Sequence, residues 1–131
     1  MPFYTCYTSQ DALSSQEKAH VAAEVTRIHV QHTGAPRGFV RVLFHEVAPG
    51  DCYTGGEVAD FAMIRGVVRA GRSAEIKEAL LRDLWVLLQT VTGLGDQELL
   101  VSVQENPAAN AMEGGEVLPE PGEEREWLAR H

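Results

Sequence analysis

Pro2 is the most informative candidate for a reactive residue in this chain, because it directly follows Met1. A small residue after the initiator methionine normally allows that methionine to be removed. Its removal would leave a free secondary amine on a rigid ring, which can act as a base, an acid or a nucleophile. Many chains begin with the same two residues and have no catalytic proline, so Pro2 becomes informative only beside other candidate groups.

Arg69 and Arg72 bracket Ala70 and Gly71 between a predicted strand and a predicted helix. A guanidinium binds a carboxylate through two parallel hydrogen bonds. The positive end of the helix dipole favours an anion at the same place. The two arginines therefore predict a site for a small carboxylate-bearing substrate, and a solvated surface pair is the alternative.

His29 and Glu113 are the remaining candidate groups. His29 lies one turn after Val25, beside the apolar stripe of a predicted helix. It is either a packed core histidine or a donor of a hydrogen bond to a substrate carbonyl or carboxylate. Glu113 follows Met112 in a predicted loop, where its carboxylate is either solvated or catalytic.

Length and charge restrict the kinds of protein that this can be. A chain of 131 residues predicts a single domain that spans 1–131. The formal net charge of -8 argues against nucleic acid and anionic membranes as partners. No apolar run approaches the ~20 residues of a membrane span. The first residues also lack the features of a secretory signal, so we expect a cytoplasmic protein.

The thiols and imidazoles predict no metal centre. Cys6 and Cys52 have no His or Cys partner at the spacing of zinc ligands, and His20, His32 and His45 show no metal spacing either. We therefore expect buried or idle thiols, no metal ion and no organic cofactor.

The sequence repeats itself at an offset of 59 positions, without a gap across more than forty residues. The matched pairs are Ser14 with Ser73, Lys18 with Lys77, Gly34 with Gly93, Val42 with Val101, Glu46 with Glu105, and Gly55 with Gly114. The repeat defines two units, 2–60 and 61–119, followed by a tail, 120–131.

Each unit predicts a strand, a helix and a strand. The first contains a β-prone stretch at 3–8, a helix that starts at the capping box of Ser14 and Glu17 and ends near Gly34, and a strand at 39–47. The second contains a strand at 61–69, a helix at 73–92 and a strand at 98–105. The segments 49–56 and 106–115 predict loops, and Trp127 in the tail is a candidate anchor onto a neighbouring subunit.

Residue alternation assigns the faces of the strands. Val40, Val42 and Phe44, with their repeat partners, predict the face that the helices cover. The opposite face mixes polar and apolar residues, namely Arg41, Leu43, His45, Leu100, Ser102 and Gln104. Because a helical crossover joins parallel strands, we expect an α+β fold: a four-stranded sheet with two helices on one face. The uncovered face predicts an oligomer.

Taken together, these features resemble the tautomerase superfamily, and most closely its cis-3-chloroacrylic acid dehalogenase subgroup. The resemblance rests on Pro2 followed by Tyr4, on fused βαβ units, and on motifs that cover nearly the whole chain. These motifs are Ile-His-x-x-x-Thr-Gly at 28–34, Arg-Ala-Gly-Arg-Ser at 69–73, Met-Glu-x-Gly at 112–115 and Leu-Pro-x-Pro-Gly-x-Glu-x-x-Trp at 118–127.

The resemblance implies a homotrimer and a set of site residues. By motif, the site residues are Pro2, His29, Arg69, Arg72 and Glu113. Ser102 stands where the subgroup has a tyrosine that assists the glutamate in activating water, so hydration chemistry should be weaker here. Pro2 aligns with Phe61 in the repeat, which implies one proline-based site in each chain.

We therefore expect an isomerase, a tautomerase that moves a proton between the enol oxygen and the carbon of a 2-oxo acid such as phenylenolpyruvate. Pro2 would transfer the proton, while Arg69, Arg72 and His29, beside Ser102, would bind the substrate. One alternative is a cofactor-independent dehalogenase or hydratase of 3-substituted acrylates, in which Glu113 activates water. Another is a non-catalytic module that binds a carboxylate or takes part in signalling.

Overall fold

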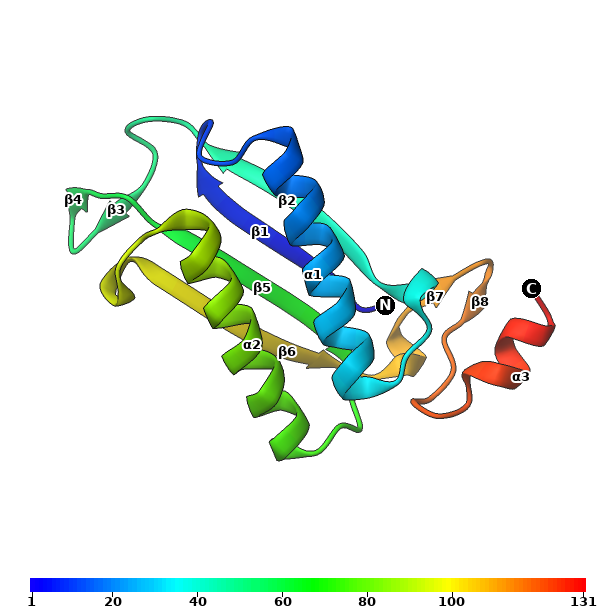
Figure 1. The fold of residues 1–131 in the computed structure, drawn as a ribbon. Coiled ribbons are helices and arrows are strands. Elements are labelled where there is room, and N and C mark those ends of the chain that lie inside the picture. Colours follow the sequence, from blue (N-terminus) through cyan, green and yellow to red (C-terminus); the bar gives the residue numbers. More distant parts are fainter.

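A four-stranded sheet with strand order β2-β1-β5-β6 forms the centre of the computed structural model, which describes residues 1–131 (Figure 1). Its strands are β1 (Phe3–Ser9), β2 (Arg41–Val47), β5 (Ala62–Arg69) and β6 (Leu99–Asn106). The pairs β1–β2 and β5–β6 are parallel, whereas β1 and β5 are antiparallel. Because the two βαβ units meet through β1 and β5, their equivalent ends lie at opposite ends of the sheet.

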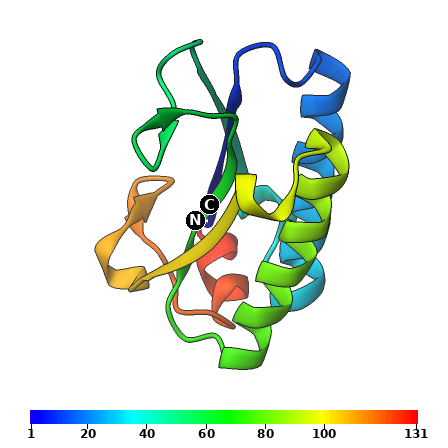
Figure 2. The same cartoon turned by 90° about the vertical axis from the view of Figure 1, so that its left-hand side faces the viewer.

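Two helices of 19 residues, α1 (Ser15–Thr33) and α2 (Ala74–Thr92), cover one face of the sheet (Figure 2). The predicted capping box starts α1: the backbone N–H of Glu17 donates to Ser14 Oγ at 3.1 Å, and the N–H of Ser14 donates to the Glu17 carboxylate at 2.9 Å. Gly34 ends this helix at φ 71°, a left-handed conformation that glycine adopts without steric cost. Local signals therefore determine where the helix begins and ends.

The core lies between the two helices and the sheet. Val42, Phe44 and Val101 pack against it from the strands, as the alternation predicts. Its fully buried members from the helices are Val21, Val25, Ile28, Leu80, Leu84 and Leu88. This apolar layer fixes the rotation of each helix about its axis, and so fixes which side chains of α1 and α2 point toward the sheet.

The internal repeat is present in three dimensions. The two helices begin 59 positions apart, at Ser15 and Ala74. Lys18 forms an ion pair with Glu46 at 3.1 Å, and the repeat partners Lys77 and Glu105 form the same pair at 2.7 Å. Matched residues therefore make matched contacts in the two units.

Two short hairpins correct the prediction of loops at 49–56 and 106–115. Strands β3 (Tyr53–Thr54) and β4 (Glu57–Val58) form one hairpin, and β7 (Met112–Glu113) and β8 (Glu116–Val117) form the other. Each turns through a Gly-Gly pair at positive φ, 59° and 84° in the first, as a two-residue hairpin turn requires. The Gly-Gly pairs indicated turns in the sequence. The flanking strands were not predicted, because two residues are too few to show the alternation of polar and apolar side chains. Short 3₁₀ turns precede β2 (Arg37–Phe39), β6 (Asp96–Glu98) and β7 (Ala108–Asn110).

The tail forms a helix, α3 (Glu124–Ala129), beside the β7–β8 hairpin (Figure 1), and Trp127 of this helix packs in one cluster with Met1. Trp127 is buried within its own chain: its Nε1–H donates to the carbonyl of Val117 at 2.9 Å, and its ring packs edge-on against Phe39. The prediction that Trp127 anchors the tail onto a neighbour was therefore wrong, because the indole already has its partners in the same chain.

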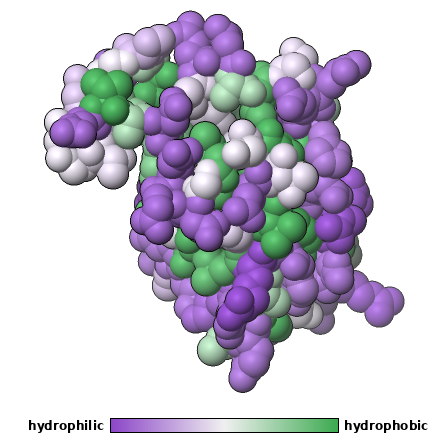
Figure 3. All heavy atoms as spheres, turned by 60° about the vertical axis from the view of Figure 1, so that its left-hand side comes forward, coloured by the Kyte–Doolittle hydropathy of each residue, from purple (hydrophilic) through white to green (hydrophobic).

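The sheet face opposite the helices has no covering layer in the chain. Phe3, Leu43 and Leu100 are 40%, 48% and 42% exposed there. On the side that carries the β3–β4 hairpin, hydrophobic residues show between hydrophilic ones (Figure 3). Neither long helix is apolar enough to pass through a bilayer.

Candidate active site

The N-terminus enters the structure at the start of β1, at the end of the sheet where the tail lies (Figure 1). Pro2 is fully buried, and its carbonyl accepts a hydrogen bond of 3.1 Å from the backbone N–H of Arg41. Met1 precedes it with 3% of its surface exposed, and the α-amino group of Met1 forms an ion pair with Glu113. The chain end is therefore an enclosed group rather than a solvated one.

The side chain of Met1 fills an apolar chamber. The residues around it are Phe39, Ala108, Leu118 and Trp127, and all of them are buried. The Nδ2 group of Asn106 lies 3.7 Å from the Met1 sulfur. Loss of Met1 would open this space next to the Pro2 nitrogen.

Glu113 lies on β7, where the hairpin brings it to the N-terminus. Its carboxylate also accepts a hydrogen bond of 3.4 Å from Arg41, and its side chain is 29% exposed. The pKa of the α-amino group of Met1 is lowered by burial, which outweighs the opposing effect of the Glu113 carboxylate. An amine at this place therefore loses its proton more readily than an exposed one does.

His29 is buried on α1 and bound to Tyr4 of β1. The Tyr4 hydroxyl lies 2.8 Å from His29 Nδ1, and the two rings meet edge to face. Burial lowers the pKa of His29 to about 3, and the charges of Arg72, Arg69 and the N-terminal ammonium act in the same direction. The imidazole is therefore neutral at neutral pH, and its buried Nε2 has no partner in the chain.

Arg69 ends β5, and two of its guanidinium nitrogens have partners near the C-terminus. Its Nη1 donates to the carbonyl of Pro119 at 2.7 Å, and its Nη2 donates to Glu124 at 2.7 Å. Its guanidinium also lies over the ring of Phe39, 5.4 Å from the ring centre. The side chain is only 1% exposed, so the predicted pair of arginines is not a pair of equivalent free groups.

Arg72 lies just before Ser73, whose side chain caps the N-terminus of α2. Its Nε–H is buried and unpartnered, and burial followed by the charge of Arg69 lowers its pKa. In the whole chain, Arg72 Nε and His29 Nε2 are the two buried side-chain nitrogen or oxygen atoms that lack a hydrogen-bond partner. Buried polar atoms without a partner are costly, and the charge of Arg72 acts on His29. The two atoms therefore indicate a site for an oxygen-bearing ligand.

Ser102 lies apart from the other predicted site residues. It is paired in register with Arg65, whereas Asn106 is paired with Arg69 at the end of the sheet. The four steps along the strand from Ser102 to Asn106 correspond to about 13 Å. The structure thus brings Pro2, His29, Arg69, Arg72 and Glu113 to one end of the fold, but it leaves Ser102 on the open sheet face.

Two residues of this region were not predicted from the sequence as site residues. Tyr4 had a usable signal, because it lies two positions after Pro2 and therefore on the same face of β1. Glu124 had none, because it is one of six glutamates between 113 and 126, and nothing local distinguishes the one that meets an arginine.

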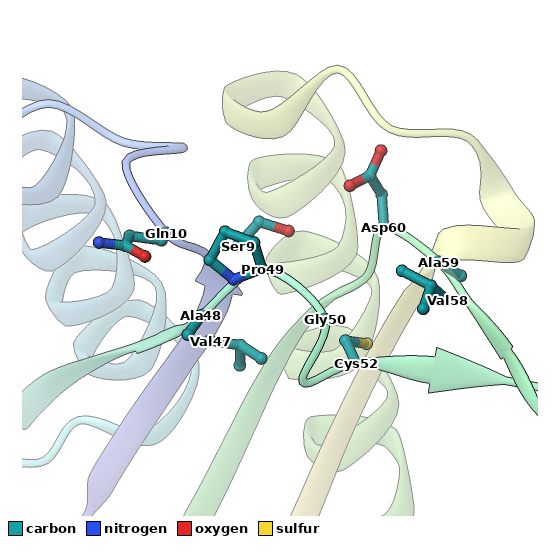
Figure 4. Close-up of a pocket in the computed structure, with 10 residues that line it drawn as sticks. All are labelled: Ser9, Gln10, Val47, Ala48, Pro49, Gly50, Cys52, Val58, Ala59 and Asp60. Carbon is teal, nitrogen blue, oxygen red and sulfur yellow. The ribbon is translucent and has the colours of Figure 1, made fainter.

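The opposite end of the sheet holds an open cavity of about 370 Å³ (Figure 4). Gln10 and Asp60 line it. At the repeat offset of 59 positions, Gln10 corresponds to Arg69, and Asp60 corresponds to Met1. Leu88 stands at the repeat position of His29. The charged groups gathered around Pro2 therefore have no equivalent at this end.

Known proteins resemble this chain in both sequence and structure. The crystal structure of N1, a member of the cis-3-chloroacrylic acid dehalogenase family, has 31% identity and a TM-score of 0.92, over 98% of this chain and 92% of that one. The F6 fused 4-OT asymmetric trimer has 25% identity and a TM-score of 0.81, over 88% and 94% of the two chains. "Probable tautomerase LL0574" of Lactococcus lactis subsp. lactis (strain IL1403) is 37% identical over 43 residues, which are 33% of this chain and 70% of that protein.

The family model described as "Putative oxalocrotonate tautomerase enzyme" matches residues 1–131. This match covers every residue of the fold and of the site described above. The chain belongs to this tautomerase family.

Proposed function

We propose that this protein catalyses enol–keto tautomerisation of a 2-oxo acid, and that the amine of Pro2 transfers the proton after Met1 has been removed. The observation that carries the proposal is the position of the N-terminus, which is buried and ion-paired with Glu113 at the end of the sheet that also holds His29 and Arg72. Membership of a tautomerase family supports the reaction class.

In the proposed reaction, the neutral Pro2 amine takes the proton of the enol hydroxyl and delivers a proton to the adjacent carbon. The O–H bond and the C=C π bond break, while the C–H bond and the C=O π bond form. Pro2 is buried, and burial would favour the neutral amine, as it lowers the pKa of the adjacent α-amino group of Met1. The reaction requires no oxidant, reductant or water.

The substrate carboxylate would lie against Arg72, with the charge of Arg69 behind it. The neutral His29, with Tyr4 bound to its Nδ1, can donate from Nε2 to a substrate oxygen. The apolar chamber that Met1 fills would receive the part of the substrate farthest from its carboxylate. This chamber favours a substrate with an aryl or alkyl group there over one with a second charged group.

We also propose that the protein is a homotrimer. The sheet face opposite the helices exposes Phe3, Leu43 and Leu100, which a second copy would cover. The F6 fused 4-OT is a trimer. Ser102 lies on this face, so it can act only at a site to which another copy brings it. Light scattering checks the assembly, and a monomer would contradict it.

Dehalogenation or hydration of a 3-substituted acrylate is the second candidate. The contact of Glu113 with the N-terminus and the likeness to N1 favour it. Ser102 replaces the tyrosine that the dehalogenase chemistry uses, so we expect at most a slow side activity. Robust turnover of cis-3-chloroacrylate that is lost in Glu113→Gln would reverse this ranking.

The first experiment measures ketonisation of phenylenolpyruvate by the wild type and by Pro2→Ala, with intact mass showing that Met1 has been removed from both. We expect fast turnover that the variant loses. Turnover that survives in the variant would exclude the Pro2 mechanism. Carboxylate binding without turnover by the processed wild type would favour a binding module.

A further inference from the structure

We propose that Asn106 is a specificity-determining residue, and that its side-chain amide donates a hydrogen bond to a neutral oxygen or sulfur atom in the part of the substrate farthest from the carboxylate. The substrates that it favours are 2-oxo acids with a short apolar stem that contains an ether or thioether. The inference rests on the proposed function and deepens it, because it names the distal group of the substrate.

Asn106 is held in a fixed place at the C-terminal end of β6. Its backbone is paired in register with Arg69, and its carbonyl accepts a hydrogen bond of 3.0 Å from the N–H of Ala70. Two residues further on, Ala108 is buried in the same apolar cluster as Met1. The strand and this cluster therefore fix where the half-buried side chain of Asn106 starts, as a residue that selects substrate requires.

The side chain of Asn106 contacts the residue that processing would remove. Its Nδ2 lies 3.7 Å from the sulfur of Met1, which is its only hydrogen-bond contact in the chain. A thioether sulfur is a weak acceptor, whereas an amide NH2 group offers two donors. Once Met1 is absent, the amide of Asn106 points at the vacated place with no acceptor from its own chain.

Met1 itself indicates what kind of group this place accepts. Its side chain is an apolar stem that ends in a sulfur atom and a methyl group, and it packs among apolar residues with 3% of its surface exposed. Met1 is bonded to the Pro2 nitrogen, which is the atom that would exchange a proton with the substrate. A substrate that reacts at Pro2 and extends along the same path brings its distal atoms to Asn106.

The internal repeat indicates that the fold does not need this amide. At the offset of 59 positions Asn106 corresponds to Val47, and Val47 is the last residue of β2 as Asn106 is the last residue of β6. The first unit therefore ends its strand at this position with an apolar side chain. The amide occurs only in the unit whose strand ends beside Met1, which favours a role toward a ligand over a role in the fold.

The apolar surroundings limit the acceptor to a neutral one. Phe39, Leu118 and Trp127 pack around Met1, and burial of a charge among such residues without a charged partner is costly. The amide of Asn106 is itself neutral. An ether oxygen or a thioether sulfur leaves the stem largely apolar, and a hydrogen bond from Asn106 offsets the cost of burying it.

The test compares two acids of closely similar shape, 4-methoxy-2-oxobutanoate and 2-oxohexanoate, in which an ether oxygen takes the place of one CH2 group. Both are keto acids, so tautomerisation is followed by NMR in D2O. Each enolisation removes a proton from C3, and the return step brings deuterium to the same carbon. The measured quantity is the ratio of kcat/KM for the ether to kcat/KM for the hydrocarbon, on protein whose intact mass shows that Met1 has been removed.

Asn106→Val introduces the residue that the repeat has at this position, so the strand should still form. We expect the ratio to fall about fivefold to tenfold, the effect of one neutral hydrogen bond. Differences between the two acids in hydration and reactivity are the same for both proteins and cancel in this comparison. Asn110→Val is the matched control, because Asn110 is exposed on the 3₁₀ turn after β6, and it should leave the ratio unchanged.

Two results with Asn106→Val would overturn the inference. An equal fall in kcat/KM for both acids would show that the residue acts on the fold and not on the distal group. A ratio that stays within about twofold of the wild-type ratio would show that the amide makes no such hydrogen bond.

Binding separates this inference from the proposed function. If the wild type does not turn over phenylenolpyruvate, the proposed function fails, and calorimetric Kd values of the same two acids replace kcat/KM. The same replacement applies if the acids bind without deuterium exchange. A Kd ratio that changes in Asn106→Val but not in Asn110→Val would support the contact. An unchanged Kd ratio, or a wild type that binds neither acid, would overturn it even if phenylenolpyruvate is turned over.

Discussion

The hydroxyl of Tyr4 lies 2.8 Å from Nδ1 of His29, and this contact joins α1 to the strand that begins at the chain end. Pro2 immediately precedes β1, two residues before Tyr4, and both side chains are fully buried. A hydrogen bond in the core therefore fixes the orientation of the imidazole relative to Pro2.

Tyr4→Phe should destabilise the fold by about 1–3 kcal/mol, because it leaves the buried Nδ1 of His29 without a partner. We also expect kcat for phenylenolpyruvate to fall, since the ring loses the contact that orients Nε2. Urea unfolding and steady-state kinetics measure the two effects. Tyr53→Phe removes the same hydroxyl from an exposed ring and should change neither quantity. An unaffected free energy of unfolding in Tyr4→Phe would show that the contact contributes nothing.

Gly66→Ala should be strongly destabilising although its backbone is unstrained. A Cβ at Gly66 would lie 2.4 Å from Cε1 of the Tyr4 ring, so the ring must move and its bond to His29 must break. Overpacking of this kind costs about 1–3 kcal/mol. Gly38→Ala is the control, because a Cβ there meets no atom within 4 Å. Thermal unfolding of both variants should separate them, and equal melting temperatures would contradict the prediction.

His29 should make the fold less stable as the pH falls from about 6.5 toward 3. The pKa of His29 is lowered to about 3 in the folded chain, from an ordinary value of 6.5. Between these values the unfolded state binds a proton that the folded state does not, so the free energy of unfolding decreases with falling pH, by at most about 1.4 kcal/mol per pH unit for one proton. In His29→Gln the unfolded state cannot bind this proton, so the free energy of unfolding of the variant should vary less over the same pH range. Identical pH profiles would refute the assignment.

Folded protein that retains Met1 should resist methionine aminopeptidase. Met1 is 3% exposed, and Trp127 and Leu118 close the chamber around it. Trp127→Leu should speed the excision by loosening the chamber, whereas Leu128→Ala, a change at a half-exposed position of the same helix, should not. Intact mass against time measures the rate. Rapid excision from the folded wild type would mean that the N-terminus opens readily.

Much of the fold follows from local patterns in the sequence. The repeat, the caps at Ser14 and Gly34, and the alternation in β2 and β6 predicted two helices over one face of four strands, and the structure has that arrangement. These features depend on residues within a turn of helix or a few positions of strand. Because the sequence repeats, each element was predicted twice, once in each unit, and the two units make equivalent contacts, such as the Lys18–Glu46 and Lys77–Glu105 ion pairs.

The site was only partly predictable. His29, Arg69, Arg72 and Glu113 were named from residue type, spacing and resemblance, and the fold brings them to the end of the sheet where Pro2 begins the chain. Ser102 was named in the same way, and it lies on the open face that the alternation predicted. Its register with Arg65, however, places it four positions along the strand from the end of the sheet where the other site residues lie.

The sequence by itself determined the elements, their faces and the types of the reactive groups. Only the tertiary structure decided which of those groups are free. Arg69 is engaged by Glu124, 55 positions away, and Trp127 is buried by its own chain instead of by a neighbour. The physical reason is that a guanidinium or an indole binds whichever partner the chain path brings near, and that path depends on the packing of the whole fold.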